Sequence, residues 1–180
     1  MLIVADTKDW TWTIERSCPE CGFDAGAVPA GDIGDAVLRL TEPWQQVLRR
    51  RDVADRPDPQ VWSPLEYGAH IRDVCQIFAV RLRQLLTEDD ARFTNWDQDA
   101  TAEQSRYAEQ DPLVVAGDIR SAAESLAVAY RGVPDRAWGR KGLRSNGSEF
   151  TVLTLGQYLL HDLAHHLVDV RAVPGTAAAH

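Results

Sequence analysis

Apolar residues recur at intervals of three and four positions along four stretches of this chain, which is the pattern of amphipathic helices. The first stretch begins at Asp32, and its apolar positions are Ile33, Val37, Leu40, Trp44 and Val47. Pro43 lies inside this run and is expected to kink or split the helix, because proline lacks the backbone N–H that a helix interior uses.

The second predicted helix has the clearest start signal in the sequence, SPLE at 63–66. Ser63 can cap the free amide groups, and Pro64 suits the first helical position. Glu66 completes a capping box with Ser63. The stripe that follows consists of Tyr67, His70, Val74, Ile77, Arg81 and Leu85. His70 is therefore expected to point toward the core side.

Two more helices follow the same rules. One begins at Asp111 and Pro112, again a cap followed by a proline, and ends at RGVPD. The other follows Thr151 and contains LGQYLLHDLAHHLVDV. The turn-rich link 139–150 between them is expected to form a hairpin-like loop. The polar segment 87–110 is long for a connection, and such a length often indicates a functional loop.

Four capped helices without convincing strand alternation predict an all-α protein, a four-helix bundle over residues 31–174. Residues 1–30 mix tryptophan, proline and glycine without helical periodicity and are interpreted as an irregular N-terminal extension. Residues 175–180 are expected to form a flexible tail. A length of 180 residues fits one such domain.

Charge and hydropathy limit the partners. The formal net charge of -8 argues against nucleic acid, because no basic face is available to neutralise phosphates. No apolar run is long enough to cross a membrane, and the start MLIVADTKDW does not resemble a signal peptide. Three cysteines are too few for a disulfide framework. We therefore expect a soluble cytoplasmic protein.

Three of the five histidines lie within HDLAHHL at 161–167. Residues four apart stand on the same face of a helix, so His161 and His165 are expected to present two imidazoles side by side on a core-type stripe. His166 is displaced by about 100° and is expected on the neighbouring edge.

Two unpartnered imidazoles are costly to bury, and a divalent metal would offset that cost. Two ligands on one helix do not complete a protein site, and His70 is the other histidine on an apolar stripe. A metal on His70, His161 and His165 would keep open positions, as catalytic ions do. The alternative is that hydrogen bonds satisfy the three histidines without any metal.

Acidic residues close to the histidines are interpreted mainly as solvated. Asp73 and Asp162 are assigned to exposed helix faces. Asp169 is the candidate partner of His165, since ligand histidines usually donate their second N–H to an oxygen.

The acidic connection 87–110 supplies two candidates for a substrate pocket, Trp96 and Asp97. Asp97 could line the mouth of the metal site. The alternative is a solubilising loop in which Trp96 is pinned to the bundle. Arg81, on the stripe of His70, is interpreted as a rim residue and not as a catalytic one.

Cys18 and Cys21 form a C-x-x-C pair in CPEC, and no second pair exists. Three interpretations stay open: inert thiols in a tight turn, a reversible disulfide, and a half zinc site completed by histidines. A Cys2His2 finger is excluded by the separation of CPEC from HDLAHH. Cys75 is interpreted as a buried apolar residue.

The segments WSPLEYGAHIRDV, NWDQDAT and HDLAHHLVDV, in this order, resemble the DinB-like superfamily over about residues 32–172, in particular its actinobacterial members. DWTWTIERSCPECGFD is similar to the N-terminal extension of those members. The resemblance implies an up-down-down-up bundle and a metal on three histidines, by position His70, His161 and His165. In relatives of mycothiol-dependent maleylpyruvate isomerase one ligand is a glutamate, and the matching place here is interpreted as histidine.

Several members of this family are thiol S-transferases, which implies a divalent metal, zinc or nickel, and a mycothiol-like thiol acting on a small electrophile. The isomerase's second domain is absent here, so isomerase activity is not implied. The rival function is a non-enzymatic stress or structural module whose metal is closed by a fourth ligand, such as a cysteine of CPEC. A homodimer is left open.

Overall fold

The protein is a bundle of four helical arms, seen in a computed structural model that describes residue 3 and residues 8–172. The first arm is divided into α1 (Ile33–Thr41) and α2 (Trp44–Val47), and the others are α3 (Pro64–Thr87), α5 (Pro112–Arg131) and α6 (Val152–Asp169). Pro43 separates α1 from α2, as predicted. The expected four-helix bundle is confirmed, whereas the tail 175–180 lies outside the described residues.

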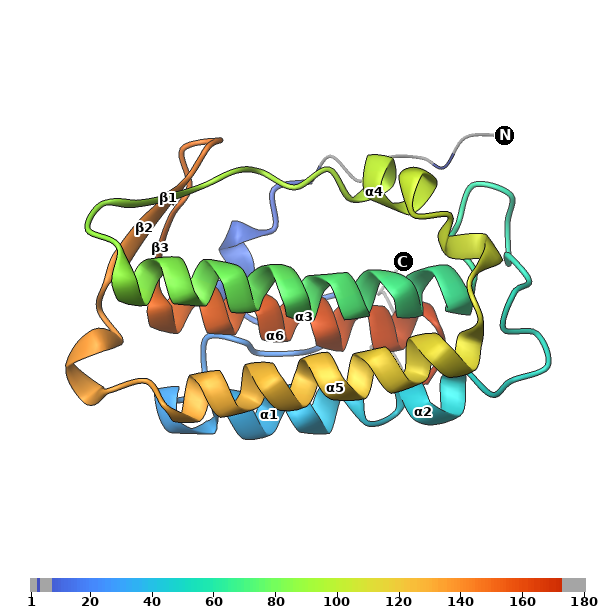
Figure 1. Ribbon diagram of the computed structural model, residues 1–180, viewed down its shortest axis with the longest axis horizontal. Helices are drawn as coiled ribbons and strands as arrows, with labels where there is room; N and C mark the ends of the chain where they lie inside the picture. Colours follow the sequence, from blue (N-terminus) through green and yellow to red (C-terminus); the bar gives the residue numbers. More distant parts are fainter. Residues whose placement is uncertain (1–2, 4–7, 173–180) are drawn as a thin grey trace.

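The direction of the helices follows the expected up-down-down-up order (Figure 1). The second and third arms, α3 and α5, run the same way, and α1 and α6 run the opposite way. Around the bundle, α1 packs on α5 and α6, and α3 packs on the same two helices. Because α3 and α5 are parallel neighbours, the chain must return along the whole bundle between them.

Predicted caps fix the helix starts. Ser63 Oγ accepts a hydrogen bond from Glu66 N at 3.3 Å, and the Glu66 carboxylate accepts one from Ser63 N at 2.8 Å. This reciprocal pair satisfies two otherwise free N–H groups of α3. Asp111 caps α5, and Thr151 caps α6 with Thr154.

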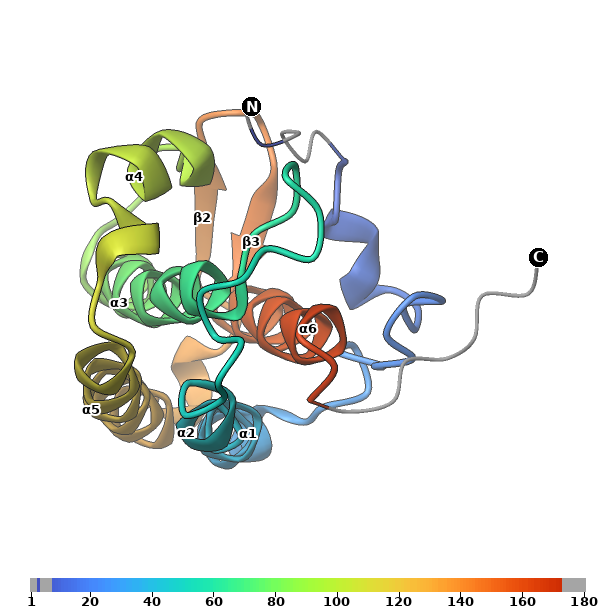
Figure 2. The same cartoon turned by 90° about the vertical axis from the view of Figure 1, so that its right-hand side faces the viewer.

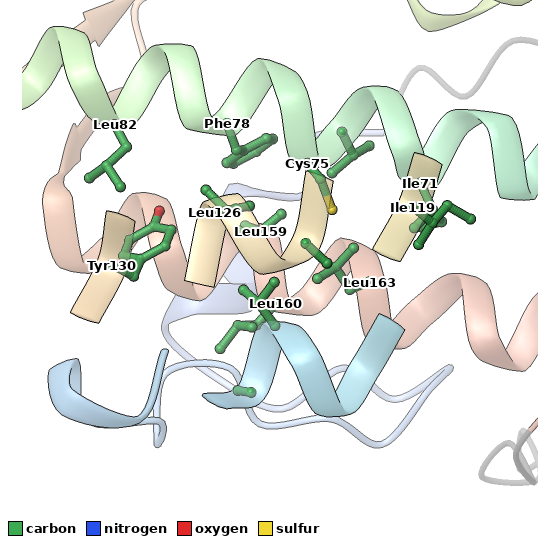
Figure 3. Close-up of a cluster of buried hydrophobic side chains, with 14 of the residues drawn as sticks. Ile71, Cys75, Phe78, Leu82, Ile119, Leu126, Tyr130, Leu159, Leu160 and Leu163 are labelled. Carbon is green, nitrogen blue, oxygen red and sulfur yellow. The ribbon is translucent and has the colours of Figure 1, made fainter. Parts of the chain in front are cut away.

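The core lies between the helices and is apolar. Figure 3 shows Phe78 and Leu82 of α3 close to Leu126 of α5 and Leu159 of α6. Burial of one such side chain contributes about 1.5–3 kcal/mol. Cys75 belongs to this cluster with no exposed surface, which agrees with its interpretation as an apolar core residue.

A small three-stranded sheet closes one end of the bundle (Figure 1). The strand β1 (Ala91–Phe93) pairs in parallel with β2 (Lys141–Arg144), which pairs antiparallel with β3 (Glu149–Thr151). The hairpin of β2 and β3 was anticipated as a turn-rich link. The strand β1 was not, because three residues are too few for an alternating pattern.

The return connection between α3 and α5 is more ordered than its polar sequence suggested. After β1 it contains α4 (Gln98–Gln104) and the 3-10 turn η3 (Tyr107–Glu109). Tyr107 is buried against α3, and its hydroxyl donates a hydrogen bond to Asp73. The sequence had suggested that Asp73 is solvated. In the structure it instead accepts a hydrogen bond from the connection.

The N-terminal extension packs against α6. Its described part includes the 3-10 turn η1 (Thr11–Ile14) and leads into η2 (Ala30–Asp32). Viewed along the bundle, α6 lies between α3 and this extension (Figure 2). Gln157 of α6 donates hydrogen bonds to the carbonyls of Gly26 and Val28, both at 3.0 Å.

Another short 3-10 turn, η4 (Asp135–Ala137), follows α5. Within the described residues, no helix is sufficiently long and apolar to span a membrane.

Candidate metal centre

A cavity of about 830 Å³ opens beside α6 and is lined by aromatic, charged and imidazole side chains. Trp10 lines it from the extension, Trp62 from the segment before α3, and Trp96 from the return connection. Arg81 and Arg144 line it from α3 and β2. Another wall is α6, which presents histidine and aspartate side chains to the cavity. The cavity therefore joins aromatic surfaces with groups that can bind a metal or an anion.

The first group of potential ligands consists of His70, Asp162 and His166, which offer ligand atoms within 4.8 Å of one another. His70 Nε2 lies 3.8 Å from Asp162 Oδ2, and His166 Nε2 lies 3.2 Å from Asp162 Oδ1. His70 is 1% exposed, and neither of its ring nitrogens has a hydrogen-bond partner among the described residues. Two imidazoles and one carboxylate are a common ligand set for a catalytic divalent ion.

Asp169 fixes the orientation of His166. Its Oδ2 lies 2.7 Å from His166 Nδ1, which leaves Nε2 of the same ring directed at Asp162. A carboxylate on the second nitrogen is the usual support of a ligand histidine. The sequence assigned Asp169 to His165, and the structure places it on His166, three residues away along α6.

Burial and charge set the protonation of this group. Burial lowers the pKa of His70. Burial also acts to lower the pKa of His166, but its hydrogen bonds to Asp162 and Asp169 raise that pKa to about 10. Burial acts to raise the pKa of Asp162, yet the imidazoles of His166 and His70, at 3.2 and 3.8 Å, hold it well below its usual range. Asp162, interpreted as solvated from the sequence, is thus an ionised partner of two histidines.

Aromatic side chains cover His70. Trp96 stacks on the imidazole with ring centroids 5.2 Å apart and planes 4° apart, and Trp62 packs at 5.3 Å. The indole N–H of Trp96 donates to Thr101 Oγ1 at 2.7 Å, which holds the ring in place. Asp97 caps α4 through Ala100 N and also lines the cavity. Both pocket candidates from the connection therefore lie at the cavity.

The second group of potential ligands consists of Cys18, Cys21, His161 and His165, again with ligand atoms within 4.8 Å of one another. Cys18 Sγ lies 3.8 Å from His165 Nδ1. Both cysteines are free thiols. His161 is 4% exposed, and its Nε2 has no hydrogen-bond partner in the described part of the chain. Burial and the neighbouring His165 lower the pKa of His161 to about 4.

The structure does not bring His70, His161 and His165 together as one set; it divides them between two groups. His161 and His165 do lie side by side, with ring centroids 5.2 Å apart, as their spacing predicted. They face the extension, however. The next pair on the helix, Asp162 and His166, is turned by about 100° and meets His70 on α3.

A pair of arginines was not recognised as part of the site. Arg81, interpreted as a rim residue, is 6% exposed, and its guanidinium donates to Thr94 O at 3.1 Å. Arg144 is also buried and donates to Asn146 Oδ1 at 2.9 Å. No carboxylate of the described residues lies within 4.0 Å of either guanidinium. Burial, together with the charge of Arg144, lowers the pKa of Arg81 to about 10.

Comparisons with known proteins agree with this architecture. The family model of the DinB superfamily matches residues 34–169. YfiT from Bacillus subtilis, a probable metal-dependent hydrolase with an unusual four-helix bundle topology, is a similar solved structure. Its TM-score is 0.71 at 16% identity, over 79% of this chain and 83% of YfiT.

A second similar structure is that of the mycothiol-dependent maleylpyruvate isomerase. Its TM-score is 0.66 at 16% identity, and the alignment covers 83% of this chain. It covers 63% of the isomerase, so this chain spans less than two thirds of that protein's length. No curated protein matches the chain.

Proposed function

This chain belongs to the DinB superfamily, and we propose that it is an enzyme that holds a divalent ion, zinc or nickel, on His70, Asp162 and His166. The proposed reaction is transfer of a low-molecular-weight thiol, such as mycothiol, to a small electrophile. One observation carries the proposal: His70 is buried beside Asp162 with both ring nitrogens unpartnered among the described residues. Such a histidine is costly unless something binds it.

The ligand set fits a catalytic ion better than a structural one. The group has three members within 4.8 Å, and two of them, Asp162 and His166, line the cavity. Catalytic zinc commonly has three protein ligands and one open position. An ion in this place would lower the pKa of a coordinated thiol, so that thiolate forms at neutral pH.

Neighbouring residues would prepare the site for this role. Asp169 holds the His166 ring through Nδ1, so Nε2 stays available as a ligand atom. Trp62 and Trp96 pack on His70 and exclude water from that side. Positioning of this kind reduces the reorganisation that binding a co-substrate requires.

Similarity to a known structure supports the choice of a thiol co-substrate, and two arginines in the cavity support an anionic electrophile. The likeness to a mycothiol-dependent isomerase supports a thiol co-substrate. Arg81 and Arg144 line the same cavity without a carboxylate of the described residues within 4.0 Å. Two guanidinium groups of this kind favour an anionic group on the electrophile, since arginine binds carboxylates through paired N–H donors.

The competing function is a non-enzymatic metal-binding module with a closed ion. That function requires a fourth protein ligand next to His70, Asp162 and His166. Among the described residues this group has three members. The four-membered group on the other face of α6 meets the requirement, and it is considered separately below.

The test uses untagged protein freed of metal and reloaded with Zn²⁺ or Ni²⁺. Its turnover is followed as thioether formation between mycothiol and a fluorogenic alkyl halide. We expect loaded wild type to accelerate the reaction and His70→Ala to lose one metal equivalent and at least about 100-fold in rate. Asp162→Asn should behave similarly.

The matched control is Asp118→Asn, which changes an exposed carboxylate on α5. It should keep both the metal and the activity. Unchanged metal content in His70→Ala would contradict the ligand assignment. Metal-loaded wild type that binds mycothiol but transfers it no faster than buffer would contradict the reaction.

A further inference from the structure

A tight turn in the extension brings the two thiols of CPEC to one side. Gly22 N donates a hydrogen bond to Cys18 O at 2.7 Å, and Cys18 N donates to Phe23 O at 3.0 Å. Gly22 has a φ of 74°, a left-handed conformation that favours glycine. This local geometry places both sulfur atoms against α6.

The facing helix supplies two imidazoles one turn apart. His165 directs Nδ1 at Cys18 Sγ, 3.8 Å away, and its Nε2 lies 3.7 Å from Glu20 Oε2. His161 contributes a buried ring whose Nε2 has no hydrogen-bond partner in the described residues. The four ligand atoms lie within 4.8 Å of one another, although they come from segments far apart in the sequence.

We propose that Cys18, Cys21, His161 and His165 bind a second, structural Zn²⁺ that is distinct from the ion at His70. Two thiolates and two imidazoles complete a tetrahedral zinc site without an open position. On binding, each thiol gives up its proton to solvent and forms a zinc–sulfur bond, and no electrons are transferred. Glu20 would support His165 by accepting the N–H of Nε2.

Zinc accounts for this cluster better than a disulfide does. A bond between Cys18 and Cys21 would consume both sulfurs and leave His161 Nε2 buried without a partner. Zinc uses the thiols and both imidazoles together. Trp10 packs on the rings of His161 and His165, with centroids 5.3 and 5.0 Å away, and shields this group from solvent.

The consequence would be mechanical. Residues 8–30 of the extension contain no α-helix, and η1 is four residues long. Zinc would fasten it to α6 near Cys18, while Gln157 holds it near Gly26. Because Trp10 and Glu20 line the cavity, the structural ion would also keep one wall of that cavity in place.

The experiment is reconstitution of reduced, untagged, metal-free protein with Co²⁺ alone. Thiolate bound to tetrahedral cobalt gives a near-ultraviolet charge-transfer band, which the His70 group cannot produce because it contains no sulfur. We expect wild type to bind two metal equivalents and show the band. Cys18→Ser with Cys21→Ser should lose the band and one equivalent. Asp162→Asn should lose the other equivalent and keep the band.

Cys75→Ala is the matched cysteine control and should keep the band, because Cys75 lies in the apolar core. Should the double serine variant not fold, zinc X-ray absorption of the wild type decides, with sulfur expected at about 2.3 Å. Absence of the band in wild type, its persistence in the double variant, or a Cys18–Cys21 disulfide under reducing conditions would overturn the proposal.

Discussion

Two faces of one helix, offset by a single residue, carry ligand sets of different character. Asp162 and His166 meet His70 across the bundle, whereas His161 and His165 meet two cysteines of the extension. The first set mixes oxygen and nitrogen between two long helices. The second mixes sulfur and nitrogen between a helix and a turn. Both contain a buried imidazole nitrogen without a partner among the described residues.

The two groups differ in the number of their ligands and in whether those ligands include soft sulfur donors. Three ligands at the edge of a cavity leave room for a co-substrate, as in catalytic zinc sites. Four ligands with two thiolates suit zinc held only for structure. Because residues four apart share a face, two such pairs fit on adjacent positions of α6 without sharing an atom.

The largest effect that separates the two groups is expected from single histidine changes on α6. His166→Ala should weaken metal binding at the His70 group by more than about 100-fold and leave the cysteine group intact, because a ligand is lost on one face only. His161→Ala should do the reverse. Metal titration with a chelator competitor measures both. Equal loss from both groups in either variant would show that they form one site.

An intermediate effect is expected from the carboxylates behind the histidines. Asp169→Asn should weaken binding at the His70 group by about 10–100-fold, because the acceptor that orients His166 loses its negative charge. Glu20→Gln is the matched change at the other group. The same titration should show each effect confined to its own group. An unchanged metal affinity in Asp169→Asn would contradict the role of Asp169 in orienting His166.

The smallest effect is expected from a substitution in α3, the helix that carries His70 but no residue of the cysteine group. Glu66 is buried at its first turn and is paired with Arg56. Burial acts to raise the pKa of Glu66, yet hydrogen bonds from Arg56 and Ser63 lower it from its usual value. The ionised form is therefore favoured by folding, and the stability it contributes is present above about pH 4.5 and is lost as the pH falls through the folded-state pKa.

Glu66→Gln should accordingly lower the unfolding free energy of metal-free protein by about 1–2 kcal/mol at neutral pH and by less in acid. Urea unfolding at several pH values measures this difference. Exposed Glu42→Gln is the control and should be nearly neutral. A difference for Glu66→Gln that grows on acidification would contradict the assigned sign. Metal binding at both ligand groups should be unchanged in Glu66→Gln.

Local signals predicted the bundle well because they depend on neighbours in the chain. Ser63 with Glu66, the break at Pro43 and the cap at Asp111 all appear as the sequence indicated. The resemblance to the DinB-like superfamily is likewise confirmed. β1 was missed because its pairing with β2 joins residues about 50 positions apart, and three residues carry no periodic signal.

The candidate site was predicted only in part, since it depends on which face of α6 meets which neighbour. The four-residue spacing of His161 and His165 was a valid local signal, but the same spacing relates Asp162 to His166. Helical periodicity does not say which pair faces His70. The overlooked signal was Asp162 itself, a carboxylate four residues before a histidine and next to another one.

The parallel course of α3 and α5 has a consequence for the cavity. The segment that returns along the bundle between them (Figure 1) also contributes Trp96 and Asp97 to the lining of the cavity. Its two ends are anchored, by the pairing of β1 with β2 and by Tyr107 buried against α3, whereas Trp96 and Asp97 lie between these anchors. The connection that the parallel order of α3 and α5 requires therefore also forms part of the cavity wall, so substitutions at Trp96 or Asp97 should reshape the cavity without repacking the helices.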